Sequence, residues 1–277
     1  MTTTADTLRL WRSEGTAALP PQPLACIRDG AIAHVVINRP AKRNALTAQI
    51  WEALPATLRQ LGEDPAIRLV VLRGAGTAAF SGGADIEEFP TVFGDAEATR
   101  RYNAAVREAQ LAVEMLAKPT LAVVHGACVG GGCGLALACD LRFAAADARF
   151  GITPSKLGAA YSVPDTRRLV ALVGPSRAKD ILFSGRLLSA AEAAQWALVD
   201  RVFPPSALEA EAAAYAALLL ANAHQSLVIA KATINAIAGL CPRPEAELDD
   251  LFEGSFQSRD FKEGYAAFME KRRPRFE

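Results

Sequence analysis

The chain has 277 residues, 51% of them hydrophobic and 22% charged, and its 30 basic and 30 acidic residues cancel. This length and composition predict one large or two unequal domains with a full hydrophobic core, and the charge balance argues against a nucleic-acid binder. Five cysteines without a C-x-x-C pair and three scattered histidines argue against a disulfide framework or a metal site and favour a cytoplasmic protein.

Residues 1–22 lack the apolar run of a secretory signal, because Arg9, Trp11, Arg12 and Glu14 interrupt it. We interpret this segment as a flexible N-terminal extension. Further along, Gly, Asp or Arg breaks every apolar stretch before the roughly 20 residues that a membrane span needs. The sequence therefore predicts no membrane partner.

Residues 23–205 alternate between strand-like and helix-like patterns, which predicts an α/β core. Two strands are expected over 24–38, on either side of a turn at Asp29 and Gly30. A helix should follow from Thr47, a suitable N-cap, to about residue 63, with a kink or a break at Pro55.

The next predicted elements are a buried strand at 67–73, a loop rich in Gly and Ala, and a long helix over 95–117. Residues 121–140 then read LAVVHGACVGGGCGLALACD, which is typical of a strand, a glycine turn and the start of a helix. The first N–H groups of a helix have no intrahelical partner, and glycine lets another molecule approach the backbone closely. This turn is therefore suited either to stabilising a negatively charged oxygen or to close packing.

Another strand is expected at 141–147, helices at 165–183 and 189–198, and a last strand at 198–203. Residues 206–277 are expected to be helical throughout. Because such a segment cannot bury its apolar faces alone, we interpret it as a C-terminal helical oligomerisation region.

The glycine-rich loops match none of the common nucleotide or hydrolase motifs. There is no P-loop and no G-x-S-x-G elbow, and Gly74 to Gly76 lack the third glycine of a dinucleotide-binding loop. Two glycine loops remain, at 80–84 and 130–134, each after a predicted strand. Two such loops can direct one backbone N–H each to the same oxygen, which is the requirement of an oxyanion hole.

Five segments stand in order along the chain: NRPAKRNAL, FSGGADIEEF, KPTLAVVHGACVGGGCGLALACDLRFAAADARFG, GRLLSAAEAAQWALVDRVF and EGYAAFMEKRRPRF. Together they resemble the enoyl-CoA hydratase/isomerase, or crotonase, superfamily over about residues 24–277. The resemblance implies a crotonase-like α/β fold, in which a spiral of ββα units gives two roughly perpendicular sheets wrapped by helices. It also implies an enzyme that stabilises the enolate of an acyl-CoA thioester.

The resemblance assigns roles to particular residues. The backbone N–H groups of Ala84 and Gly131 match the family's oxyanion hole. The positions that match the coenzyme A-binding segments are Lys42, Ala45, Leu46, Ala84, Asp85 and Ile86. Coenzyme A enters as part of the substrate, and no prosthetic group is expected.

The resemblance further implies a homotrimer or a dimer of trimers. In such an assembly Phe268 and Lys271 would contact the coenzyme A of a neighbouring subunit. The alternative for these two residues is an ordinary amphipathic helix.

The hydratases of this family use two glutamates, and the matching positions of this chain hold Gly134 and Pro154. Neither residue can transfer a proton. The sequence therefore predicts a CoA-thioester lyase or isomerase of the enoyl-CoA hydratase type that does not hydrate by the two-glutamate mechanism. A non-catalytic acyl-CoA binding protein remains an alternative.

Tyr161 is the candidate proton donor. It lies in TPSKLGAAY, which resembles TPxxLGxxY in the methylmalonyl-CoA decarboxylase branch. A decarboxylase needs no base, because the departure of CO2 generates the enolate, and a tyrosine hydroxyl could then protonate it. Tyr161 is at least as consistent with a buried packing residue. Thr153 and Asp165 are weaker candidates, and we interpret Asp165 rather as the N-cap of the next helix and Thr153 as a residue that hydrogen-bonds within its turn.

Overall fold

The computed structural model describes Trp11 and residues 19–276, and the strands of this part of the chain form two sheets. In the larger sheet, β1 runs antiparallel to β2 and the other neighbours are parallel. Its order is β1 (Leu24–Asp29), β2 (Ile32–Ile37), β3 (Leu69–Gly74), β5 (Thr120–Val124), β7 (Leu141–Ala145) and β10 (Arg201–Phe203). The smaller sheet has the order β4 (Ala79–Ser81), β6 (Ala127–Val129), β8 (Arg149–Gly151) and β9 (Leu188–Ser189).

The helices of the described residues come from every part of the chain. They are α2 (Ala48–Glu63), α3 (Phe89–Val92), α4 (Ala96–Glu114), α5 (Gly131–Leu137), α6 (Val163–Ser184), α7 (Ala190–Gln195), α8 (Leu208–Leu220), α9 (His224–Ile237), α10 (Glu245–Ser255) and α11 (Arg259–Met269). Short 3₁₀ turns are η2 (Pro40–Lys42), η3 (Ile86–Glu88) and η4 (Pro154–Leu157). This mixed α/β architecture with two sheets confirms the predicted fold class.

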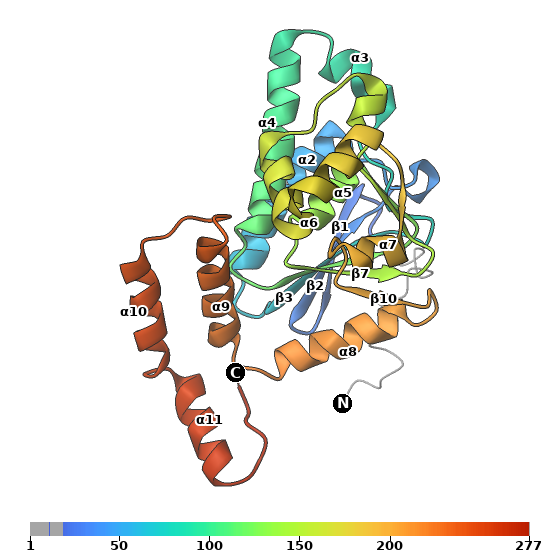
Figure 1. Cartoon of the computed structure of the whole chain (residues 1–277). Coiled ribbons are helices and arrows are strands. Elements are labelled where there is room, and N and C mark those ends of the chain that lie inside the picture. The colour runs from blue at the N-terminus through green and yellow to red at the C-terminus, as the bar shows by residue number, and fades with distance from the viewer. Residues whose placement is uncertain (1–10, 12–18, 277) are drawn as a thin grey trace.

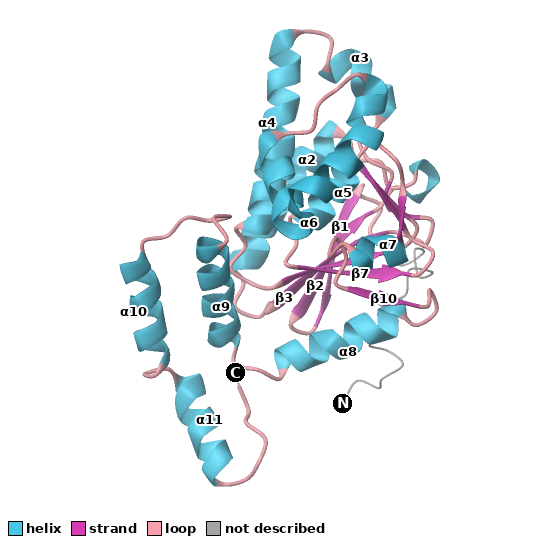
Figure 2. Ribbon diagram, viewed as in Figure 1, coloured by secondary structure: helices cyan, strands magenta, loops and turns pink. Residues whose placement is uncertain are grey.

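The central strands of the larger sheet are covered on both faces. Every residue of β2, β3 and β5 is buried, as expected for parallel strands that lie between helices. One apolar cluster joins a face of this sheet to α2, α4, α5 and α6, and another joins the opposite face to α8. Figures 1 and 2 show these helices on either side of the strands.

Helix α2 begins where the sequence predicts. The Thr47 side chain accepts a hydrogen bond from the N–H of Ile50 at 3.3 Å, which confirms it as the N-cap. The helix continues through Pro55 to its end, so the break that Pro55 predicts does not occur. Pro55 is itself buried, and we attribute the continuity to its packing, which offsets the missing N–H.

Helix α6 differs from the prediction in two respects. Its N-cap is Ser162, whose hydroxyl accepts a hydrogen bond from the N–H of Asp165 at 3.2 Å, so the interpretation of Asp165 as the N-cap is wrong. A serine three residues earlier reaches the free N–H first. The helix is also interrupted at Gly174, where φ is 78° and ψ is 165°.

The chain ends in a helical tail, as predicted for residues 206–277. Helix α8 packs on the larger sheet, and α9 is joined to the body by Lys231, which donates to Asp140 at 2.8 Å. Helices α10 and α11 extend away from the body (Figure 1). The predicted extension over residues 1–22 falls mostly outside the described residues, but Trp11 is buried and its indole N–H lies 3.2 Å from an Asp29 carboxylate oxygen.

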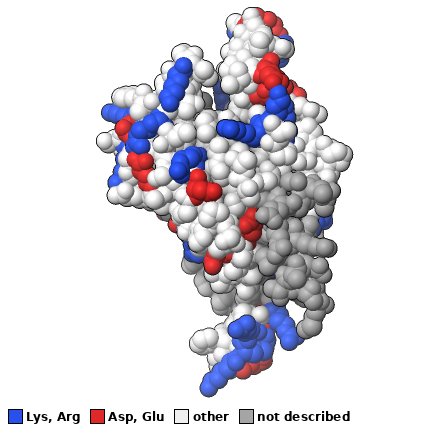
Figure 3. Space-filling model, turned by 90° about the vertical axis from the view of Figure 1, so that its right-hand side faces the viewer, with Lys and Arg blue, Asp and Glu red and all other residues white. Residues whose placement is uncertain are grey.

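Acidic and basic side chains are interspersed over the body on the face that Figure 3 shows. Among the described residues, no single helix has the length and apolar composition to cross a bilayer. The helices α8 and α9 meet those criteria only when taken together, and they are bent by 102° at their junction.

Candidate active site

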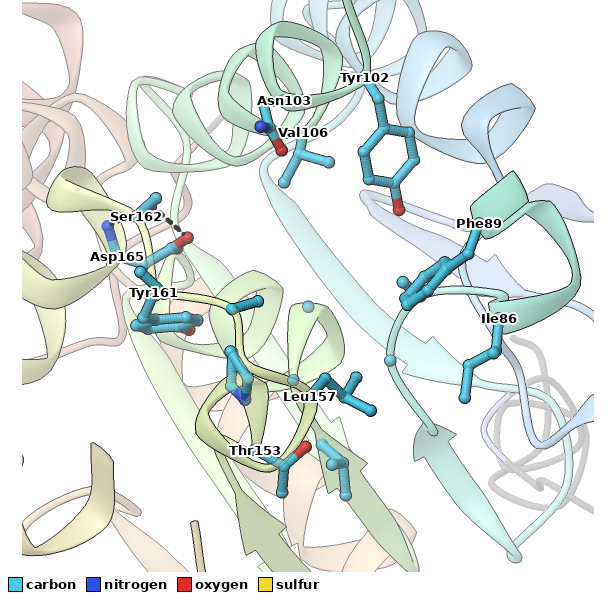
Figure 4. Close-up of a pocket in the computed structure, with 18 of the residues that line it drawn as sticks. Ile86, Phe89, Tyr102, Asn103, Val106, Thr153, Leu157, Tyr161, Ser162 and Asp165 are labelled. Carbon is cyan, nitrogen blue, oxygen red and sulfur yellow. Dashed lines mark hydrogen bonds between the residues drawn. The ribbon is translucent and has the colours of Figure 1, made fainter. Parts of the chain in front are cut away.

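A cavity of about 520 Å³ lies between the two glycine loops, helices α3 and α4, and the segment that leads into α6. Apolar side chains line much of it: Trp51, Ile86, Phe89, Phe93, Val106 and Leu157. Its polar side chains include Asn103, Gln110, Thr153, Tyr161, Ser162 and Asp165. Figure 4 shows the last three of these residues on the side of the cavity opposite Ile86, Phe89 and Tyr102.

The loop after β4 contributes Ala84 to this cavity. Ala84 forms a parallel bridge with Leu46, in which the Leu46 N–H donates to Gly83 O at 2.8 Å and Leu46 O accepts from the Asp85 N–H at 3.0 Å. Both bonds involve the neighbours of Ala84, so the N–H of Ala84 itself points away from Leu46. Ala84 also lines the cavity.

The second glycine loop supplies another donor. Gly131 begins α5 and lines the same cavity, and its N–H has no acceptor within the helix. The two loops are in close contact, because a Cβ on Gly83 would lie 3.0 Å from Val129 O, and a Cβ on Gly132 would lie 2.6 Å from Ser81 Cβ. Glycine is required at both contacts.

Tyr161 lies beside Gly134 at the far side of the cavity. A Cβ on Gly134 would lie 2.9 Å from the Tyr161 hydroxyl, 3.0 Å from Asp165 Oδ1 and 2.5 Å from Gln110 Nε2. The hydroxyl of Tyr161 is buried and has no hydrogen-bond partner among the described residues. Burial, together with the nearby Asp165, raises the pKa of Tyr161 well above its ordinary value.

Asp165 belongs to a buried polar cluster behind the cavity wall and is 4% exposed. Its Oδ2 lies 2.6 Å from the Ser162 hydroxyl, and its Oδ1 accepts from Arg168 at 3.2 Å. Arg168 also donates to Glu114 at 2.6 Å and to Gln110 Oε1 at 3.3 Å. Burial raises the pKa of Asp165, against the opposing effects of the Ser162 hydrogen bond and of Arg168.

Sequence reasoning names Asp165 only as a weaker candidate and does not predict the other members of this cluster. Gln110 lies in the middle of α4, where no motif distinguishes it from other polar helix residues. Asp165 carries one usable signal, because it stands four residues after Tyr161 at the start of a helix. Only the packing of α4, α5 and α6 brings the two side chains to Gly134.

Of the predicted coenzyme A-binding residues, Ala84 and Ile86 line the cavity. Ile86 lines the cavity and is 66% exposed. Asp85 is buried and pairs with Arg39 at 2.7 Å. The Lys42 side chain is exposed at the surface, where its ammonium group pairs with the exposed Glu87.

The remaining predicted residues lie outside the cavity. Ala45 and Leu46 belong to the segment beside the Ala84 loop, and Leu46 is fully buried. Phe268 is 81% exposed near the end of α11, and Lys271 follows that helix. Within one chain neither Phe268 nor Lys271 lines the cavity.

None of the described residues forms a group of three or more His, Cys, Asp and Glu side chains that could hold a metal ion. His125, a buried histidine, has its Nε2 2.8 Å from a Glu209 carboxylate oxygen. The polar groups available to a ligand in the cavity are the backbone N–H groups of the two loops and the polar side chains that line it.

Comparison with known proteins gives a consistent result. The family model described as enoyl-CoA hydratase/isomerase matches residues 28–277. A crotonyl-CoA hydratase of Syntrophomonas wolfei is 33% identical over 250 residues, which are 90% of this chain and 95% of that protein. A short-chain-enoyl-CoA hydratase of Clostridium acetobutylicum is 33% identical over 252 residues, with 89% and 94% covered.

The fold agrees with solved structures as well. An enoyl-CoA hydratase/carnithine racemase from Magnetospirillum magneticum superposes with a TM-score of 0.89 at 38% identity, covering 96% of this chain and 99% of the other.

Proposed function

Because the chain belongs to the enoyl-CoA hydratase/isomerase family, we propose that it acts on an acyl-CoA thioester whose carbonyl oxygen accepts hydrogen bonds from the Ala84 and Gly131 N–H groups. The observation that carries this proposal is that two backbone donors from separate loops line one largely apolar cavity. Such donors stabilise the negative charge that develops on a thioester oxygen when an enolate forms.

The cavity also suits the rest of an acyl-CoA. Its apolar walls can hold an acyl chain, and the exposed Lys42 and Ile86 lie where the coenzyme A part would leave the protein. Coenzyme A is then part of the substrate. In a homotrimer or a dimer of trimers, Phe268 and Lys271 of a neighbouring subunit would complete this binding surface.

Hydration by two glutamates is not the reaction that these residues favour. Gly134 and Pro154 stand at the two glutamate positions of the family's hydratases. The space beside Gly134 is already taken by the polar groups of Gln110, Tyr161 and Asp165. Those side chains are therefore the candidates for the proton-transfer group of this enzyme.

A CoA-linked decarboxylase is the second candidate function. The buried Tyr161 hydroxyl without a partner favours it, because a decarboxylase needs a proton donor and no base. Release of CO2 from malonyl-CoA or methylmalonyl-CoA, without hydration of crotonyl-CoA, would support this alternative.

The test measures binding and turnover in a matched pair of variants. Isothermal calorimetry with butyryl-CoA gives the affinity, and a panel of enoyl-, hydroxyacyl- and malonyl-type CoA thioesters gives the turnover. Gly131→Pro removes the N–H at a first helical position, where proline is tolerated, whereas Gly131→Ala adds a Cβ and keeps the N–H.

We expect Gly131→Pro to lower kcat by about 10²–10³-fold relative to Gly131→Ala, because one oxyanion-hole donor is lost. Absence of butyryl-CoA binding to the wild type would refute the proposal. Binding without turnover of any panel member would instead support a non-catalytic acyl-CoA binding protein.

A further inference from the structure

The polar groups around Gly134 come from three parts of the fold. Gln110 lies on α4, Tyr161 precedes α6 and Asp165 lies in the first turn of α6. All three direct a polar atom to within 3.0 Å of the point that a Cβ on Gly134 would occupy. All three residues also line the cavity, so α6 places a carboxyl group beside the point from which a side chain at position 134 would start.

The charges behind the cavity wall do not balance. Arg168 is the only cation in the buried cluster formed by Gln110, Glu114, Ser162, Asp165 and Arg168, which also contains two carboxyl groups. Its contact with Glu114, at 2.6 Å, is shorter than its contact with Asp165, at 3.2 Å. Glu114 therefore takes the larger share of the guanidinium charge. Asp165 therefore has the weaker ion pair of the two carboxyl groups.

We propose that Asp165 is a catalytic acid–base residue of this site and moves a proton between its carboxyl group and the α-carbon of the bound acyl-CoA. The inference rests on the proposed function, since it needs the thioester oxygen to be held by Ala84 and Gly131. Tyr161 contributes a hydroxyl beside the same reacting carbon, and Ser162 holds Oδ2 by its hydrogen bond.

The step balances without a further reactant. The α C–H bond breaks, the proton forms an O–H bond on the Asp165 carboxylate, and the electron pair passes to the thioester oxygen. The reverse step returns a proton to the α-carbon. In a decarboxylation the C–C bond to CO2 breaks instead, its electron pair passes to the thioester oxygen, and Asp165 gives its proton to the α-carbon. One proton taken up from solvent, which is the proton that decarboxylation consumes, then restores the Asp165 carboxylic acid.

The groups that face the carboxyl group of Asp165 fit this role. Burial, the first cause, raises the pKa of Asp165, while Ser162 and Arg168 oppose that effect. Gln110 faces it from α4, and Glu114 acts on it through Arg168. The α5 side presents Gly134 to the carboxyl group. The neighbouring titratable groups are the Tyr161 hydroxyl, which lies beside Gly134 with Asp165, and the Cys133 thiol of α5, which acts on Tyr161.

Deuterium exchange tests the inference without knowledge of the natural substrate. Butyryl-CoA is incubated with the full-length protein in D2O, and mass spectrometry measures deuterium uptake at the α-carbon. Asp165→Asn keeps the size of the side chain but cannot accept the proton. We expect it to lower the exchange rate by about 10²-fold or more while calorimetry shows that butyryl-CoA still binds.

Two further variants separate chemistry from structure. Asp180→Asn makes the same change at an exposed position of α6, where Asp180 pairs with Arg186, and should leave the exchange rate unchanged. Asp165→Glu retains a carboxyl group and should keep part of the activity. In the wild type, exchange should rise with pH through the pKa of Asp165, because abstraction needs the carboxylate, and this dependence should vanish in Asp165→Asn.

The outcomes distinguish the two proposals. If Asp165→Asn exchanges at the wild-type rate, or if the wild type binds butyryl-CoA without any exchange, the role of Asp165 is refuted. If the wild type does not bind butyryl-CoA at all, the proposed function itself fails.

Discussion

Individual buried ionisable side chains in this protein differ in whether a counter-charge accompanies them. Arg142 donates to Asp200 at 2.9 Å, and Lys231 donates to Asp140 at 2.8 Å. His34 on β2 is fully buried, and neither of its ring nitrogens has a hydrogen-bond partner among the described residues. Its ring meets the Trp11 ring edge-on, with centroids 4.7 Å apart. The folded protein thus holds His34 in its neutral form.

This residue predicts a specific loss of stability in acid. Burial and the neighbouring Arg73 charge lower the pKa of His34 from 6.5 to about 3. Between those two values the unfolded chain binds a proton that the folded chain does not, so stability falls as pH falls. For this one proton, the free energy of unfolding falls by about 1.4 kcal/mol per pH unit in that range.

Denaturant unfolding at several pH values between 7 and 4 checks this prediction. The control is His34→Leu, which lacks the titrating group but keeps every carboxylate. The free energy of unfolding should fall more steeply in the wild type than in this variant below pH 6. Parallel curves for the two proteins would contradict the prediction.

At the scale of elements, α6 consists of two helical pieces that meet at Gly174. The backbone there has φ 78° and ψ 165°, a conformation that is essentially restricted to glycine. A Cβ at Gly174 would meet nothing within 4 Å. Backbone strain alone therefore explains why a side chain is unfavourable at this junction, which lies between the Asp165 end of α6 and its C-terminal half.

Gly174→Ala should lower the free energy of unfolding by about 1–3 kcal/mol through this strain. Gly254 within α10 also has open space around the position of a Cβ, but it is helical. Gly254→Ala should therefore raise stability by about 0.5–1 kcal/mol, because alanine is the better helix former. Thermal unfolding of the two variants compares them directly, and a loss of equal size in both would rule out backbone strain as the cause.

Local signals decide which elements sequence reasoning can predict. Thr47 and Asp95 act within one turn as the N-caps of α2 and α4, so the starts of both helices are predictable. The strands of the smaller sheet have three residues or fewer, and they are too short to show alternation. Pairing with distant segments defines these strands, and no local sequence pattern predicts that pairing.

The candidate site divides in the same way. The loops of Ala84 and Gly131 carry recognisable glycine patterns, and the structure places both residues on one cavity, with Tyr161. The buried cluster around Arg168 joins α4 to α6 across 54 residues between Glu114 and Arg168. A contact over such a distance follows from tertiary packing and leaves no motif.

At the scale of the whole molecule, the tail presents an unusual surface. Helices α9 to α11 expose large apolar side chains: Ile234, Ile237, Phe252, Phe256, Phe261, Tyr265, Phe268 and Met269. Large exposed apolar surfaces on a folded protein mark sites of association. This supports the proposal that the tail joins subunits in a homotrimer or a dimer of trimers.

Light scattering after size-exclusion chromatography should give a mass of three or six copies of the 29.4 kDa chain. Phe261→Ser combined with Tyr265→Ser should lower that mass, because both side chains are exposed on α11. Val163→Ser replaces an exposed apolar residue on the body and should leave the mass unchanged. A monomer in the wild type would contradict the predicted assembly.

Gly134 also limits the order in which this site can change during evolution. A glutamate introduced there alone would collide with Gln110, Tyr161 and Asp165, whereas removal of any one of those side chains first would leave a void beside the glycine. Each single step is therefore unfavourable although the end points are both well packed. Conversion between this site and a two-glutamate site requires changes at Gly134 on α5, at Pro154 on η4 and at the side chains that surround Gly134, so a single substitution does not achieve it.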